Sequence, residues 1–110
     1  MTALDLSPDL FAAKAGEAAA LLKALAHEAR LMVLCQLTEG ERSAGALQRG
    51  SGLSQSALSQ HLAKLREEGL VATRREAQTI YYRLADPKAA RILVTLATIY
   101  CPPTKPKKRK

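Results

Sequence analysis

Two cysteines are the side chains in this sequence best suited to carry covalent chemistry. Cys35 stands in the apolar stretch 31–37, and Cys101 stands directly before Pro102. In a cytoplasmic chain, two thiols are more often redox groups, metal ligands or small buried side chains than a structural disulfide. Their positions alone leave these roles open.

The histidine and acidic side chains, which in other proteins bind metals or act as acid–base catalysts, do not group together in this sequence. His27 and His61 are far apart and share no predicted helix, and the last predicted helix offers Asp86 at its start but no histidine. Zinc sites need three or four ligands close together. We therefore expect no metal site and no cofactor. An enzyme is the least expected class, because the chain also lacks a phosphate-cradling glycine loop.

Residues 54–68 indicate a different activity, the reading of DNA. On a helical wheel Leu58, Leu62 and Leu65 form one narrow stripe that must face a core. The opposite side is small, polar and almost free of acid, which suits a helix in a major groove. The predicted DNA contacts of this helix are Ser54, Gln55, Ser56, Ser59, Gln60 and Lys64. His61 lies beside the leucine stripe, where packing and a phosphate contact are both open.

A predicted hairpin follows this helix and supplies a second set of DNA contacts. Its basic residues are Arg74 and Arg75, and Gln78 and Thr79 lie near its tip. Such a hairpin can lie along a phosphate backbone or in a minor groove. A short helix, a glycine-containing turn, a longer helix and then a basic hairpin are together far more specific than any one of these features.

Capping residues and apolar periodicity predict the elements that position these side chains. Ser7 and Pro8 open a first helix, and a second helix, central to the core, runs from about His27 to Gly40. The remaining predicted elements are a short helix over 44–49 capped by Ser43, the helix over 54–68, strands over 71–76 and 80–84, and a last helix from Asp86 to Tyr100. The predicted fold class is mainly α with a small β-hairpin, a winged helix-turn-helix.

Length and charge are consistent with one small domain and a separate tail. The 110 residues carry 17 basic and 10 acidic side chains, and five of the basic ones are Lys105, Lys107, Lys108, Arg109 and Lys110. We expect one folded domain over 1–101 and a basic, disordered tail over 102–110, which is either a solvated charge run or a non-specific phosphate contact. No apolar run is long enough to span a bilayer and no export signal opens the chain, so we expect a cytoplasmic protein with no membrane partner.

Several segments resemble the ArsR/SmtB family of bacterial repressors. They are the run from Leu53 to Leu62, then Leu65, Gly69–Val71 and Tyr82–Leu84, with Leu25–Leu31 upstream. The resemblance covers about residues 15–101, and Ala77 departs from it where a glycine is common in the wing. It implies a winged-helix homodimer, joined through its first and last helices, that binds an inverted-repeat operator in double-stranded DNA and releases it on sensing an inducer.

The positions of the two cysteines resemble the BigR/SqrR-like, sulfide- and redox-sensing branch of that family. So does the sequence from Thr98 to Cys101. By this resemblance the reduced dithiol binds DNA, and an oxidant or a reactive sulfur species bridges Cys35 and Cys101 and releases the operator. Two other readings stay open: a repressor that binds As(III) or Cu(I) through the same thiols, and a dimeric interaction module that does not repress transcription.

Overall fold

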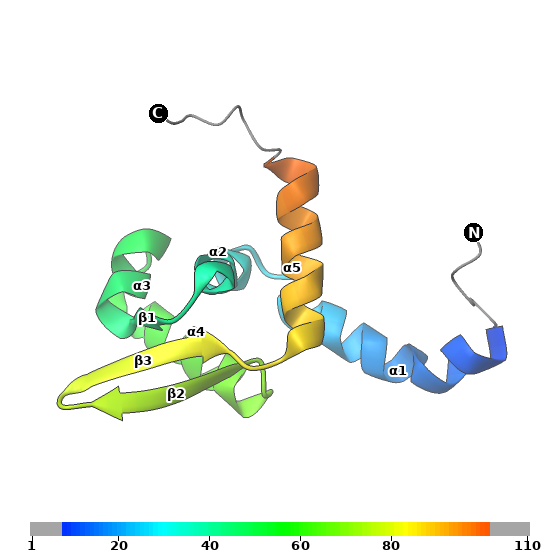
Figure 1. The fold of residues 1–110 in the computed structure, drawn as a ribbon, viewed down its shortest axis with the longest axis horizontal. Coiled ribbons are helices and arrows are strands. Elements are labelled where there is room, and N and C mark those ends of the chain that lie inside the picture. Colours follow the sequence, from blue (N-terminus) through cyan, green and yellow to red (C-terminus); the bar gives the residue numbers. More distant parts are fainter. Residues whose placement is uncertain (1–7, 102–110) are drawn as a thin grey trace.

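The computed structural model describes residues 8–101, and the predicted cap Ser7 and the basic tail over 102–110 lie outside the described residues. Within this range the order of elements is α1 (Pro8–Leu25), α2 (Glu28–Gln36), the 3-10 turn η1 (Leu37–Glu39), β1 (Arg42–Ser43), α3 (Ala44–Ser51), α4 (Gln55–Glu67), β2 (Val71–Glu76), β3 (Thr79–Leu84) and α5 (Pro87–Tyr100). Figure 1 shows α1 extending to one side while the β2–β3 hairpin extends to the other. The predicted mainly helical fold with a hairpin wing is confirmed.

Side-chain caps explain where the helices begin. The hydroxyl of Ser43 accepts a hydrogen bond from the backbone N–H of Ala46, and Ser54 accepts one in the same way, so both predicted caps are confirmed. The carboxylate of Asp86 does the same for α5, with Pro87 following it. His27, which the sequence placed at the start of α2, is also a cap, because its Nδ1 accepts from the backbone N–H of Ala29 at 3.1 Å. Each cap satisfies an N–H that has no partner within its own helix.

The second helix differs from its prediction in length and in burial. It ends at Gln36 rather than at Gly40, and a single 3-10 turn continues the chain. Val33 and Leu34 are fully buried, but Met32 is 48% exposed and Cys35 is exposed as well. The apolar run in the sequence therefore does not mean that α2 is buried on all sides. One face packs inward, and the other is left uncovered in the single chain.

The wing belongs to a sheet of three strands rather than a simple hairpin. The strand order is β1-β3-β2, and both pairings are antiparallel. The sequence analysis missed β1, because two residues carry no strand periodicity and become a strand only by pairing Arg42 with Tyr82 and Ser43 with Tyr81. The start of α3 is thereby joined to the base of the wing.

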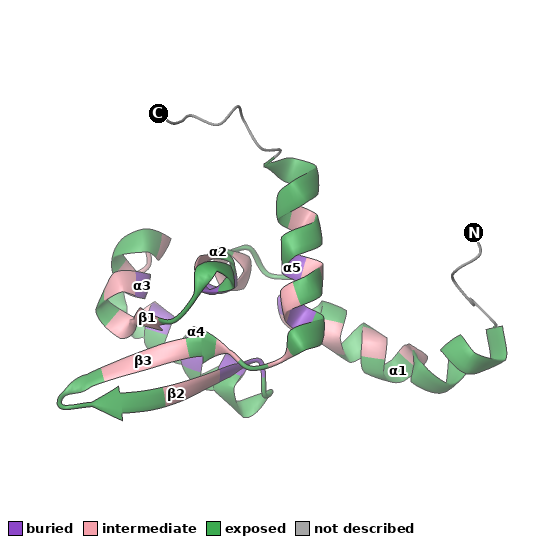
Figure 2. Cartoon of the chain, viewed as in Figure 1, coloured by how far each residue is buried: buried purple, intermediate pink, exposed green. Residues whose placement is uncertain are grey.

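The core is built almost entirely from leucine and valine. Its buried residues are Leu25, Val33, Leu34, Leu37, Leu47, Leu58, Leu62, Leu65, Leu70, Val71, Ala89 and Leu93. Figure 2 shows this core where α2, α4, the sheet and the first turns of α5 meet, whereas most of α1 and the end of α5 are exposed. None of the helices described over 8–101 is long and apolar enough to cross a membrane.

Candidate DNA-binding face and thiol pair

Helix α4 presents the polar face that its sequence predicts. Its three leucines, Leu58, Leu62 and Leu65, are 3% exposed or less, which fixes the rotation of the helix. The predicted contacts Ser54, Gln55, Ser56, Ser59, Gln60 and Lys64 are all exposed. Hydroxyl, amide and ammonium groups can donate to base edges and phosphates, and α4 carries no carboxylate before Glu67.

His61 packs against the start of α2 instead of standing on the polar face. Its ring lies 4.9 Å from the ring of His27, centroid to centroid, although the two residues are far apart in sequence. Burial, followed by the charges of His27 and Arg30, lowers the pKa of His61, so its neutral form is favoured. Nearby, Arg30 makes an ion pair with Glu68 at 3.6 Å and thereby ties α2 to the end of α4.

The wing turns at Ala77, where the family resemblance would have a glycine. Glu76 pairs with Thr79, so Ala77 and Gln78 form the tip. Ala77 has a φ of 57°, a left-handed conformation that costs an L-residue about 1–2 kcal/mol. The alanine therefore keeps the tight turn at an energetic cost. Gln78 and Thr79 are exposed at this tip, as predicted.

The two wing arginines have different surroundings. The guanidinium of Arg74 donates two hydrogen bonds of 2.8 Å to the carboxylate of Glu41 and one of 2.9 Å to Glu76. The Cζ atom of the Arg74 guanidinium also lies 4.4 Å from the centre of the Tyr81 ring. Arg75 is exposed, and no ion pair holds it within the described range. Both are predicted DNA contacts, but only Arg75 has an unengaged charge.

Cys35 lies on α2 and Cys101 at the C-terminal end of α5, two helices that pack against each other. Both are free thiols, and both are exposed. Partial burial of its sulfur raises the pKa of the Cys35 thiol, and the charge of Cys101 raises it further. Among the residues described there is no cluster of three or more His, Cys, Asp or Glu side chains that could hold a metal ion.

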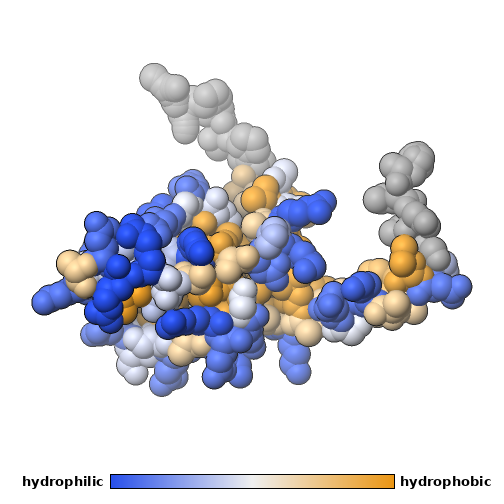
Figure 3. All heavy atoms as spheres, turned by 60° about the horizontal axis from the view of Figure 1, so that its bottom comes forward, coloured by the Kyte–Doolittle hydropathy of each residue, from blue (hydrophilic) through white to orange (hydrophobic). Residues whose placement is uncertain are grey.

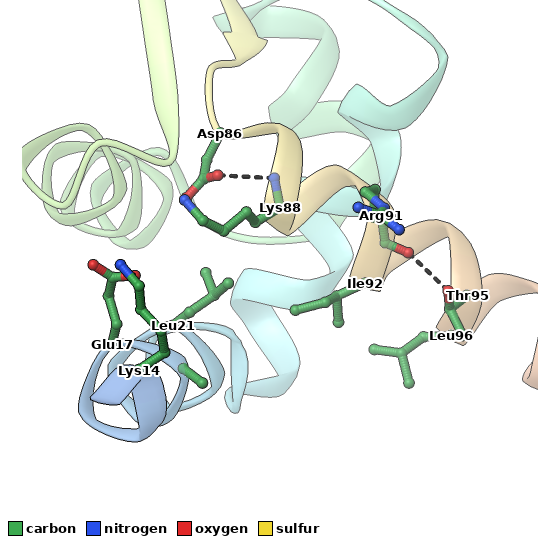
Figure 4. Close-up of a pocket in the computed structure, with 10 residues that line it drawn as sticks. Lys14, Glu17, Leu21, Asp86, Lys88, Arg91, Ile92, Thr95 and Leu96 are labelled. Atoms are coloured by element: carbon green, nitrogen blue, oxygen red, sulfur yellow. Dashed lines mark hydrogen bonds and ion pairs between the residues drawn. The ribbon is translucent and has the colours of Figure 1, made fainter. Parts of the chain in front are cut away.

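A broad groove separates α1 from α5. It encloses about 900 Å³, with an apolar floor that includes Leu21, Ile92 and Leu96. Charged side chains surround this floor, Lys14 and Glu17 from α1 and Arg91 from α5 among them (Figure 4). Further apolar side chains are exposed on the same two helices: Leu10, Phe11, Leu22, Val94, Ile99 and Tyr100. In Figure 3 hydrophilic residues dominate the end that carries the wing, and apolar ones are exposed along α1.

The profile of the bacterial regulatory proteins of the arsR family matches residues 27–73, which hold α2 to α4 and the start of the wing. The chain is also 53% identical, over 90 residues, to the biofilm growth-associated repressor of Agrobacterium fabrum. That alignment covers 82% of this chain and 77% of the relative. This chain belongs to the ArsR family.

Solved structures repeat the ArsR-family fold. The transcriptional repressor BigR from Xylella fastidiosa matches with a TM-score of 0.83 and 45% identity, over 89% of this chain and all of that one. A homodimeric winged helix-turn-helix DNA-binding domain from Mycobacterium bovis, described as a possible ArsR-family regulator, matches with a TM-score of 0.68 and 33% identity, over 90% of this chain and 89% of that one. The family resemblance and the winged-helix fold predicted from the sequence are thus confirmed.

Sequence reasoning missed two contacts that shape this ArsR-family surface. One is the pair formed by Glu41 and Arg74, whose positions differ by 33. The other is the contact between His27 and His61. Neither follows a helical or strand period, so no local signal could have shown them.

Proposed function

We propose that this ArsR-family chain is a homodimeric transcriptional repressor whose operator binding is released when Cys35 and Cys101 are oxidised or persulfidated. The observation that carries the proposal is the placement of two exposed free thiols on helices that pack against each other, Cys35 on α2 and Cys101 at the end of α5. The similarity to the Agrobacterium repressor and to BigR supports it.

The proposed dimer joins α1 and α5 to the same helices of a second copy. Large apolar side chains on these two helices, such as Phe11, Ile99 and Tyr100, are 59%, 61% and 77% exposed, and a second copy would cover them. The groove between the two helices offers further apolar surface to a partner. The homodimeric state of the Mycobacterium bovis domain is consistent with this arrangement.

In the proposed complex, two α4 helices enter successive major grooves of an inverted repeat, about 34 Å apart. Ser56, Ser59 and Gln60 read bases, because their exposed hydroxyl and amide groups match base-edge donors and acceptors. Ser54, Gln55 and Lys64 contact the backbone or flanking positions. His61 stays a predicted contact, although its packing against His27 favours a role in holding α4 in place.

The proposed release begins when a persulfide RSSH gives its outer sulfur to one cysteine thiolate and leaves as the thiol RSH. The second cysteine thiolate then attacks the inner sulfur of the new protein persulfide, so a disulfide forms and hydrosulfide departs. The bridge pulls α2 against the end of α5, which lies in the proposed interface. A small rotation there changes the spacing of the two α4 helices and loses one half-site.

Fluorescence anisotropy with a fragment of DNA from upstream of the gene tests this proposal. The protein is compared in its reduced form and after treatment with an organic persulfide or with peroxide, beside Cys35→Ser and Cys101→Ser. We expect treatment to weaken binding only when both thiols are present, with mass spectrometry showing an intramolecular bridge whose added mass distinguishes a disulfide from a polysulfide. Release that persists in either serine variant would refute the thiol mechanism. Release by stoichiometric As(III) or Cu(I) instead would favour the metalloid- or metal-responsive alternative.

A further inference from the structure

The surroundings of Arg74 give this wing arginine a role different from that of its neighbour Arg75. We propose that Arg74 is a positioning residue, which with Glu41 locks the wing in place, and that Arg75 is the wing's phosphate contact. The inference rests on the proposed DNA-binding function and refines how the wing carries it out.

The guanidinium of Arg74 is engaged on three sides. Its Nε and Nη2 meet both oxygens of Glu41, its Nη1 meets Glu76, and its flat face stacks on Tyr81. Hydrogen bonding to Arg74, with a smaller effect of Arg83, lowers the pKa of Glu41, so the pair stays fully charged near neutral pH. Two carboxylates around one guanidinium leave no excess positive charge here for a phosphate.

The strand register separates the two arginines onto opposite faces of the sheet. Arg74 pairs with Tyr81, which pairs in turn with Ser43. Arg75 pairs with Ile80 and, by the two-residue period of a strand, lies on the same face as the buried Val71. That face is the one against which α4 packs. Arg75 therefore projects on the side of the sheet that carries the recognition helix, and Arg74 projects on the other.

The Arg74–Glu41 pair joins the wing to the segment that follows α2. Glu41 lies between η1 and β1, and Arg42 beside it donates from Nε to the carbonyl oxygen of Gln36 at 2.9 Å. The wing is thus fastened at Glu41 to the segment that follows Cys35. An exposed ion pair contributes little to stability, but a two-pronged, stacked arginine strongly restricts orientation. We therefore assign it an effect on wing position rather than on folding.

Glu41→Gln tests the assignment because the two roles predict opposite signs. If Arg74 contacted phosphate directly, removing the carboxylate would free its charge and strengthen DNA binding. Positioning predicts the reverse, a loss of about tenfold, the scale of one hydrogen bond to a charged group. Arg74→Lys keeps the charge but not the two-pronged geometry, so positioning predicts a similar loss. Glu39→Gln is the matched control, since Glu39 makes a single exposed pair with Arg42.

The salt dependence of binding distinguishes a loss of wing position from a loss of stability, because a loss of stability alone does not change it. If the wing swings away, Arg75 loses its phosphate, and the slope of log affinity against log salt falls by about 0.9 per subunit in Glu41→Gln and in Arg75→Gln alike. A simple loss of stability lowers the active fraction and leaves the slope unchanged. Unchanged or tighter binding by Glu41→Gln, or an unchanged slope in Arg75→Gln, overturns the inference alone. Failure of the unmodified protein to bind any DNA overturns the proposed function as well.

Discussion

Lys64 gives the most direct quantitative test of the proposed DNA-binding face. It is exposed on the polar side of α4, one position before the buried Leu65, and has no ion-pair partner in the described part of the chain. A lysine in this place can neutralise a phosphate and release a condensed counterion. Lys64→Gln removes the charge and keeps a polar side chain that is compatible with a helix.

The expected magnitude follows from two copies of Lys64 in the proposed dimer. Each lost phosphate contact lowers the salt slope by about 0.9, so the slope should fall by about 1.8. Over a fourfold rise in salt, from about 50 to 200 mM, the unmodified protein should then lose about 12-fold more affinity than Lys64→Gln does. The two affinities should therefore converge as salt increases.

The assay is anisotropy with the same DNA fragment at five or six salt concentrations, under reducing conditions. Lys23→Gln is the control, because Lys23 is exposed on α1, belongs neither to α4 nor to the wing, and its substitution removes the same charge. The reasoning is refuted if the slope of Lys64→Gln equals that of the unmodified protein. It is equally refuted if Lys23→Gln lowers the slope as much, since net charge rather than the α4 face would then govern binding.

Three further predictions concern stability and thiol chemistry. Leu65→Ala, at a fully buried site of α4, should lower the free energy of unfolding by about 2–5 kcal/mol in urea titrations. The alkylation rate of Cys35 should increase with pH, and the midpoint of this pH profile should lie above the ordinary thiol pKa. Cys101→Ser should lower the midpoint, because it removes a like charge. The folded state lowers the pKa of His61, so the free energy of unfolding should fall as the pH drops below about 6.5 and level off below the folded pKa. His61→Gln should reduce this loss of stability in acid.

Each of these predictions has a distinct contrary result. For the core, Ala63→Ser on the exposed face of α4 should change stability by less than about 0.5 kcal/mol, and an equal loss in both variants would contradict the assigned rotation of the helix. For the thiols, a midpoint that does not respond to Cys101→Ser would show that the two side chains do not interact. For the histidine, His27→Gln serves as a control that removes the ring in contact with His61. If the free energy of unfolding falls with acid as much in His61→Gln as in the unmodified protein, another group causes the acid sensitivity.

Local sequence signals and long-range contacts account for different parts of this fold. Ser43, Ser54 and Asp86 were recognisable as caps because each bonds a backbone N–H two or three residues ahead. The leucine stripe of α4 follows the helical period, so it defined both the buried side and the polar face. These signals lie within a few residues of one another, and they were enough to predict the recognition helix, the wing and the winged-helix class.

What the tertiary structure alone decided is which distant residues meet. The two-residue strand β1, the end of α2 at Gln36, the exposure of Cys35 and the engagement of Arg74 by Glu41 all depend on neighbours that no local period predicts. The sequence by itself determined which side chains are available for DNA and for thiol chemistry, because residue type and local period set that. Only the packing of α2 against α5 and of the wing against the segment after α2 decided which of them act together, since contacts between residues far apart in the chain form only when the whole core closes.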